Sequence, residues 1–211
     1  MNQAPGRGRR LRFEGWIAGV GTASGTRLVV GYWPSSPWGE FADVMVERAD
    51  GQRELLAPSA RIADFVAGTY RFDDVTRCPV TVVAESGRWQ VAAGPLRLTF
   101  TPGRRDALGF LLRAVPRRVA SAPLWAAACD LPARCLLSGV RTRGSAGAGR
   151  REWYAALDHH PITAAQASWD GSDLGGLRWV DPPVRFGFGS VPRRPSLTRV
   201  VSTVELPAGE E

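Results

Sequence analysis

The sequence predicts a single-domain α+β protein: a bent antiparallel β-sheet or partly closed barrel with a helical insertion around residues 104–138. Most of the chain alternates apolar and polar residues with a period of two, which is typical of strands. Turn-forming residues separate these segments at short intervals. No long linker divides the chain, so residues 10–207 are expected to form one domain after a disordered basic leader at residues 1–9.

The first predicted strands lie on either side of a glycine-rich segment. Leu11, Phe13 and Ile17 share one strand face, and residues 26–33 are rich in β-branched and aromatic residues. The glycines of residues 19–25 have the spacing of a dinucleotide-binding loop. Because a second strand follows them, and not a helix whose N-terminus could hold a pyrophosphate, we interpret this segment as a hairpin.

The next predicted strand pairs two valines with two carboxylates. Val44 and Val46 are expected to face the core, whereas Asp43 and Glu47 are expected to face outward. A turn at residues 50–51 follows, because Asp and Gly both tolerate positive φ. The chain is then expected to return in a strand over residues 53–56.

Helical spacing appears in two places. In residues 57–70, an apolar stripe that includes Ile62, Phe65 and Val66 predicts one helix. In residues 104–138, leucines recur at helical spacing, and three prolines are expected to divide the block into two or three short helices. The remaining predicted strands span residues 74–84, 88–93, 96–101, 151–159, 163–169, 177–180, 184–188 and 197–206.

All 27 basic residues are arginine, which excludes chemistry that needs a lysine amine, such as a Schiff base. The net charge of +7 is compatible with a nucleic-acid or anionic-membrane partner. The arginines are spread along the chain, so we favour a solvated surface and expect no strong nucleic-acid binding.

The three cysteines form no C-x-x-C pair, and no metal or cofactor is predicted. No apolar run reaches the roughly 18 residues of a membrane span. We expect no transmembrane segment and a cytoplasmic location, and the sequence assigns no oligomeric state.

The glycine-rich segment at residues 144–149 lies between two pairs of arginines. Its spacing is that of a phosphate loop, but Arg150 and Arg151 occupy the positions that need Lys and Ser or Thr, so nucleotide hydrolysis is excluded. The loop could still hold a carboxylate or a phosphate, or could be an ordinary surface loop.

Both histidines of the chain are adjacent. In a regular strand, His159 joins Trp153 and Leu157 on an apolar face, whereas His160 joins Asp158 on a polar face. His159 is therefore expected to be buried, as a structural side chain or as an acid–base group beside a cavity.

Together these patterns predict a protein that binds a small apolar or amphipathic anionic ligand in a pocket of the sheet. The candidate binding residues comprise three that line the pocket and four arginines at its rim: Trp16, Trp153, His159, Arg141, Arg143, Arg150 and Arg151. No catalytic residue is assigned. The alternatives are an enzyme using His159 as acid or base and a basic docking module for nucleic acid or an anionic membrane. The strand pattern resembles lipocalin-like barrels in architecture alone, since Gly15 and Trp16 are adjacent where that family has Gly-x-Trp.

Overall fold

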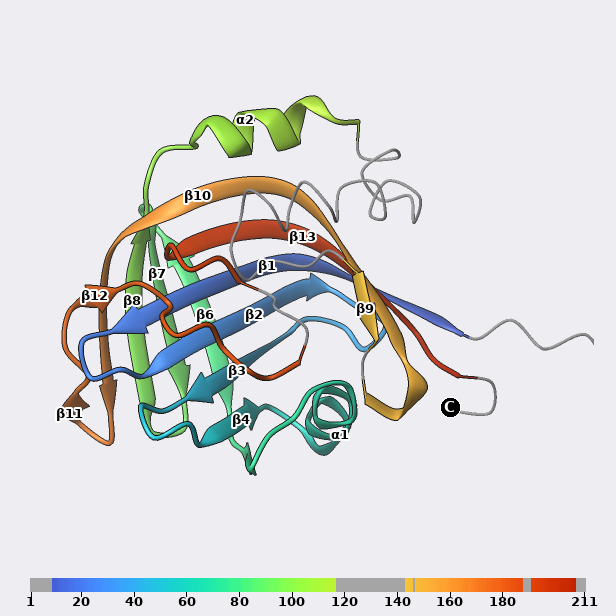
Figure 1. Ribbon diagram of the computed structural model, residues 1–211, viewed down its shortest axis with the longest axis horizontal. Coiled ribbons are helices and arrows are strands. Elements are labelled where there is room, and N and C mark those ends of the chain that lie inside the picture. The colour runs from blue at the N-terminus through green and yellow to red at the C-terminus, as the bar shows by residue number, and fades with distance from the viewer. Residues whose placement is uncertain (1–8, 117–142, 146, 188–190, 208–211) are drawn as a thin grey trace, which may run out of the picture.

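The computed structural model describes residues 9–116, 143–145, 147–187 and 191–207 (Figure 1). Strands dominate this part of the chain, and two α-helices pack against them. The elements in chain order are β1 (Arg10–Thr22), β2 (Arg27–Ser35), β3 (Phe41–Glu47), β4 (Arg53–Ala57), α1 (Ala60–Thr69), β5 (Asp74–Arg77), β6 (Val80–Glu85), β7 (Arg88–Ala93), β8 (Leu96–Pro102), α2 (Ala107–Ala114), β9 (Arg143–Ser145), a 3₁₀ turn (Gly147–Gly149), β10 (Arg151–Trp169), β11 (Ser172–Asp173), β12 (Leu177–Arg178) and β13 (Ser196–Glu205).

The strands form one open sheet in the order β5-β4-β3-β2-β1-β13-β10-β8-β7-β6, with β9, β11 and β12 attached at its sides. Its neighbours are antiparallel except for β4 and β5, which run parallel and are joined through α1. The prediction of a bent, mainly antiparallel sheet with helices is confirmed. The sheet is open and does not close into a barrel, because the end strands β5 and β6 do not pair with each other.

The bend is concentrated in β10, which is 19 residues long. Its first half pairs with β13 and its second half pairs with β8, so it belongs to both parts of the sheet (Figure 1). Two separate strands were predicted here, on either side of Pro161. That proline lies where the β13 ladder ends and the β8 ladder begins, so its missing N–H interrupts neither ladder.

Several local predictions are confirmed. The first helix begins after Ser59, whose side chain accepts a hydrogen bond from the Ile62 N–H. The hairpin between β6 and β7 turns through Ser86 and Gly87, both at positive φ. A strand was predicted over residues 184–188, but residues 184–187 do not form one. In the 104–138 block, α2 is observed, and residues 117–138 lie outside the described part of the chain.

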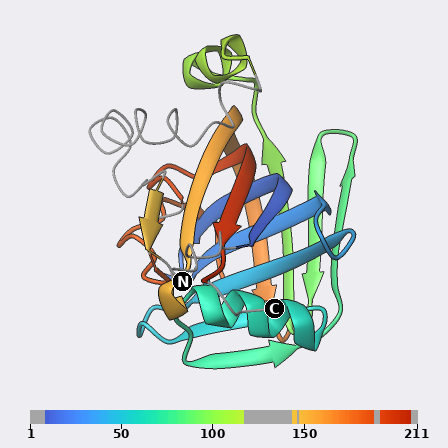
Figure 2. The same ribbon diagram turned by 90° about the vertical axis from the view of Figure 1, so that its right-hand side faces the viewer.

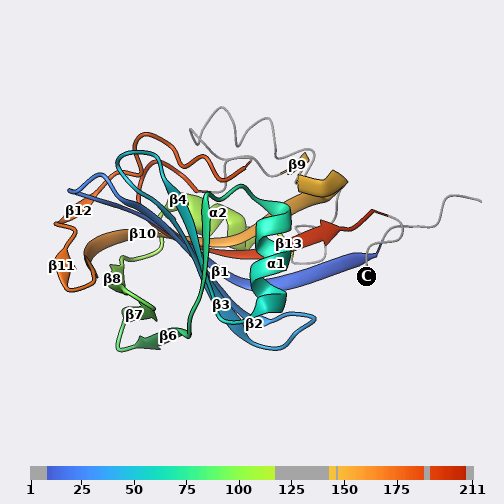
Figure 3. The same cartoon turned by 90° about the horizontal axis from the view of Figure 1, so that it is seen from below.

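Both faces of the central strands are covered, contrary to the prediction of one solvent face. Helix α1 lies against one face, and on the other face Val30 and Val44 cluster with Leu98 and Phe100 across the bend of the sheet (Figures 1, 2 and 3). Helix α2 packs on β10. Residues 180–186 and Val191 add a layer over Ile17 and Val29. The prediction that Asp43 and Glu47 face outward is therefore wrong. Both side chains are buried, with only 2% and 0% of their residue surfaces exposed.

Glu47 of β3 links this covering layer to the sheet by hydrogen bonds. Its carboxylate accepts hydrogen bonds from the backbone N–H and Nε of Arg185, at 2.7 and 2.9 Å. The buried guanidinium of Arg27 lies 3.3 Å from the same carboxylate. Neither α1 nor α2, the α-helices of the described residues, is long and apolar enough to cross a membrane.

Candidate functional site

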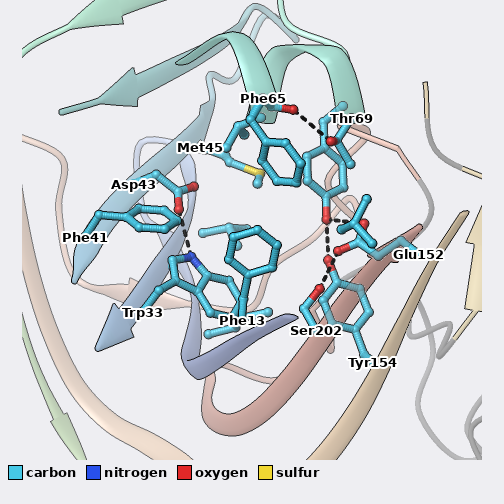
Figure 4. Close-up of a pocket in the computed structure, with 16 residues that line it drawn as sticks. Phe13, Trp33, Phe41, Asp43, Met45, Phe65, Thr69, Glu152, Tyr154 and Ser202 are labelled. Carbon is cyan, nitrogen blue, oxygen red and sulfur yellow. Dashed lines mark hydrogen bonds between the residues drawn. The ribbon is translucent and has the colours of Figure 1, made fainter. Parts of the chain in front are cut away.

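A cavity of about 50 Å³ lies between α1 and the face of β1, β2, β3, β10 and β13 (Figure 4). It exceeds the roughly 10–15 Å³ that one water needs and is far below the ~300 Å³ of pockets for drug-sized molecules. The lining is mainly apolar and aromatic, with two carboxyl groups and no basic residue: Phe13, Ile17, Val29, Gly31, Trp33, Phe41, Asp43, Met45, Phe65, Val66, Thr69, Tyr70, Glu152, Tyr154, Ser202 and Val204.

Strand periodicity explains how these residues come to share one cavity. Phe41, Asp43 and Met45 are two apart on β3, and therefore project from the same face. Glu152 and Tyr154 do the same on β10. Helix α1 completes the enclosure by laying residues of its buried stripe over that face.

Asp43 occupies one side of the cavity and has one indole as its partner. The Trp33 Nε1–H donates to Asp43 Oδ1 at 3.0 Å. Gly31 makes room for this bond, because a Cβ there would lie 2.6 Å from Trp33 Nε1 and 2.7 Å from Asp43 Oδ1. A glycine between the two is thus required for the carboxyl and the indole to meet.

Glu152 occupies the other side and is surrounded by hydroxyl groups (Figure 4). The Tyr70 hydroxyl donates to Glu152 Oε2 at 2.7 Å, and the Ser202 hydroxyl donates to Oε1 at 2.8 Å. The hydroxyls of Tyr70 and Tyr154 also form a short hydrogen bond with each other. The carboxylate therefore has several donors despite being buried.

Burial is the largest influence on the pKa values of the carboxyl groups and tyrosines that line the cavity. Burial raises the pKa of Asp43 to about 7, opposed by the hydrogen bond from Trp33 and reinforced by the charge of Glu152. Burial also raises the pKa of Glu152, while its hydroxyl partners lower it. Burial and the neighbouring Glu152 charge raise the pKa values of Tyr70 and Tyr154 well above the ordinary tyrosine value. Near neutral pH, Asp43 can both donate and accept a proton, whereas the tyrosines remain donors.

Two aromatic residues predicted to line the pocket lie elsewhere. Trp16 packs edge-on against Trp89, with their ring centroids 6.0 Å apart, in the core on the opposite face from Ile17. Trp153 lies under the Arg10 guanidinium, 5.4 Å from its ring centroid. Each is adjacent in sequence to residues that face the cavity, so strand alternation turns both away from it.

The predicted face of His159 is wrong because β10 contains a bulge. Leu157 has no partner in β13, and the register shifts between Ala156 and Asp158. His159 pairs with Thr198 and therefore shares its face with Tyr154 and not with Trp153. It is buried as predicted, with 6% of its surface exposed.

His159 interacts with Asp106 at the N-terminus of α2 and does not line the cavity. Its Nδ1 lies 3.0 Å from Asp106 Oδ2, and Asp106 accepts a hydrogen bond from the Gly109 N–H in the first turn of α2. His160 is partly buried, with its Nδ1 3.0 Å from the Gly103 carbonyl oxygen. Both rings are thus engaged by the segment that joins β8 to α2.

The four predicted rim arginines do not form one rim. Arg150 is buried, and its Nη1 donates to the Phe65 carbonyl oxygen at 2.7 Å and to Thr69 Oγ1 at 2.8 Å. Arg151 is exposed at the start of β10. Arg143 lies in β9, and Arg141 is outside the described residues.

The cavity was missed because Asp43 was assigned to a solvent face, whereas apolar lining residues such as Phe13 and Phe65 were assigned to apolar faces and given no binding role. One signal was present: Phe41 and Met45 flank Asp43 on a single strand face, so one acid is placed between two large apolar side chains. Among the described residues, no group of three or more His, Cys, Asp or Glu is arranged to hold a metal ion.

No protein-family model and no curated protein matches the chain. Among solved structures, acetoacetate decarboxylase from Legionella pneumophila is similar with a TM-score of 0.43 and 11% identity, covering 98% of this chain and 88% of that one. A putative AttH protein from Nitrosomonas europaea gives 0.33 and 13%, covering 95% and 52%. CghA, solved with Sch210972, gives 0.35 and 10%, covering 97% and 51%. The chain spans about half the length of the last two, and these likenesses establish neither a family nor a function.

Proposed function

We propose that the protein binds a small, uncharged organic molecule in the cavity between α1 and the sheet. The ligand has an apolar body and one hydrogen-bonding group, such as an amide, carbonyl or hydroxyl. The observation that carries this proposal is the presence of two buried carboxyl groups and two tyrosine hydroxyls in a mainly aromatic and aliphatic lining. Such a lining, with few polar groups, is typical of small-molecule sites.

The two carboxyl groups of the lining disfavour the anionic ligand, which is one of the two ligand types expected from the sequence. A carboxylate ligand would be desolvated beside Glu152 and Asp43, and no residue that lines this cavity is basic to compensate it. A neutral group can accept from the tyrosines and donate to a carboxylate. The cavity therefore favours the apolar ligand over the anionic one.

A matched pair of probes tests this proposal. Isobutyramide and isobutyrate have nearly the same shape, but only isobutyrate is charged near pH 7. We expect isobutyramide, and not isobutyrate, to shift the NMR signal of the Trp33 indole N–H, which is bonded to Asp43 at the cavity wall. Equal responses to both probes, or no response to the amide, would refute the proposal.

A pair of tyrosine variants provides the control. Tyr154→Phe removes a hydroxyl from the cavity and is expected to weaken amide binding about five- to tenfold, the effect of one hydrogen bond of ~1 kcal/mol. Tyr32→Phe removes a hydroxyl that binds Glu40 outside the cavity, and should leave amide binding unchanged.

A second candidate function is general acid–base catalysis on such a ligand, with Asp43 and Glu152 in the role that the sequence suggested for His159. Two carboxyl groups on opposite sides of one cavity, with different partners, favour it. Turnover of any neutral carbonyl compound should be lost in Asp43→Asn and kept in Asp50→Asn, an exposed control. Turnover that survives in Asp43→Asn would exclude this mechanism.

The basic docking module is supported less well. Many arginines of the described residues lie beside carboxylates, which neutralises part of the surplus charge: Arg10, Arg27, Arg48, Arg53, Arg105, Arg185 and Arg193.

A further inference from the structure

A second and much wider pocket adjoins the inner cavity. Its volume is about 700 Å³, within the ~300–1,000 Å³ that is usual for ligand sites. Phe65 of α1 lines both hollows, so its ring is a wall that they share. The lining of this outer pocket comes from the start of β1, the segment after β2, α1 and the chain near Leu206: Arg9, Leu11, Pro37, Trp38, Arg61, Asp64, Phe65, Arg150 and Leu206.

The two hollows have opposite charge. The inner cavity carries two carboxyl groups and no basic residue, whereas the outer pocket carries three arginines against one aspartate. A guanidinium presents a planar fork of N–H donors that matches a carboxylate or a phosphate. The other lining residues are apolar, so the basic groups border an apolar floor.

Arg150 is held at the wall of this pocket by α1. Its Nη1 donates to the Phe65 carbonyl oxygen and to Thr69 Oγ1, and its guanidinium lies 5.0 Å from the centre of the Phe65 ring. Gly68 allows the close approach, because a Cβ there would lie 3.0 Å from both terminal nitrogens of Arg150. The positive charge is thus positioned before any ligand arrives, which reduces the cost of ordering on binding.

The apolar floor is aromatic and well packed. The rings of Trp38 and Phe65 meet edge to face, with their centroids 4.8 Å apart, and Phe13 supports Phe65 from the cavity side at 5.3 Å. This floor offers an apolar body a rigid surface next to the arginines.

We infer that the outer pocket binds an amphipathic anion, a molecule with an apolar chain or ring that ends in a carboxylate or a phosphate. The head group lies against the arginines, and the apolar part covers Trp38 and Phe65. This site is separate from the inner cavity and does not depend on the function proposed there.

Calorimetric titration with octanoate, octyl phosphate and octanol tests the inference. The two anions are expected to bind and to bind more weakly as salt is added, whereas octanol, which shares their chain, is expected to bind at least tenfold more weakly. Octanoate should also change tryptophan fluorescence in the native chain and not in Trp38→Phe.

Charge-matched variants locate the site. Arg61→Ala removes an exposed arginine from the first turn of α1 and should weaken octanoate binding about tenfold, as expected for the loss of one charge-assisted hydrogen bond. Arg178→Ala removes an exposed arginine from β12, outside the pocket, and should leave binding unchanged. Equal effects of the two substitutions, or octanol binding as tightly as octanoate, would overturn the inference.

Two further measurements separate other occupants. Sedimentation with phosphatidylglycerol vesicles tests a membrane surface; binding to vesicles without binding to octanoate or octyl phosphate would assign the arginines to lipid head groups and overturn the inference. Residues 210 and 211 are both glutamates. If octanoate binds only to a variant that lacks residues after Pro207, the arginines serve this acidic segment, and the inference fails.

Discussion

Replacing Asp43 with Asn is expected to stabilise the protein in mildly alkaline solution, although it removes a polar residue from the interior. The pKa of Asp43 is about 7 in the folded protein against 3.8 for an ordinary aspartate. The folded state therefore holds this proton more tightly than the unfolded state does. The stability that results is fully present below the unfolded pKa and is lost as the pH rises through the folded pKa.

The size of the effect follows from the difference in pKa. About three pKa units correspond to about 4 kcal/mol of unfolding free energy over the whole range, because one unit is worth roughly 1.4 kcal/mol. Of this, about 3 kcal/mol is lost between about pH 5 and about pH 8. Asn cannot ionise, and its side-chain oxygen can still accept the bond from Trp33 Nε1, so the variant should escape this loss.

Urea unfolding of the native chain and the variant, repeated at several pH values from about 5 to 8, measures the difference. Asp50→Asn is the control: Asp50 is exposed, and its Oδ1 accepts a bond from the Gln52 N–H that Asn can also accept. The control should follow the native chain at every pH. A free-energy difference between Asp43→Asn and the native chain that does not change with pH, or a variant less stable at about pH 8, would refute the reasoning.

Three other substitutions have expected outcomes that stability and exchange measurements can check. Glu47→Gln should lower the unfolding free energy by about 3–5 kcal/mol, because the buried Arg27 loses its carboxylate; a loss below ~1 kcal/mol in urea would contradict this. Gly109→Ala would place a Cβ 2.3 Å from the His159 carbonyl oxygen, so α2 must move from β10 and its amides should exchange faster with D₂O; unchanged exchange would show that the helix tolerates the methyl group. His159→Ala should cost about 1–3 kcal/mol in thermal or urea unfolding, because Asp106 loses its ring partner; an unchanged midpoint would mean that this pair adds nothing.

The sequence predicted strands and turns well where one local rule decides the structure. Period-two alternation located β1 and β8, and the conformational freedom of glycine located the turn after residue 50. Helix α1 was also found, since its apolar stripe recurs at helical spacing. These signals depend on a few neighbouring residues and need no knowledge of the remaining fold.

The site could not be found in the same way because it depends on what covers the sheet. Asp43 and Glu47 alternate with valines, and alternation alone cannot tell a solvent face from a second buried face. The bulge at Leu157 shifted the face of His159, and nothing local in the sequence marks it. The arginine-lined pocket combines residues 9, 61, 150 and 206, which only the finished topology brings together.

The position of β13 has a consequence for how the protein is made. This strand, Ser196–Glu205, lies between β1, Arg10–Thr22, and β10 in the middle of the sheet, so its partners are far apart in the sequence. While a ribosome is still translating residues before 196, β1 and β10 lack the strand that joins them, and their apolar faces stay incompletely buried. Productive folding is therefore expected to be slow and to wait until β13 has been made, since contacts of such high sequence separation must form before the core closes. In the meantime, the exposed edges of β1 and β10 are the segments most open to chaperones and to mispairing.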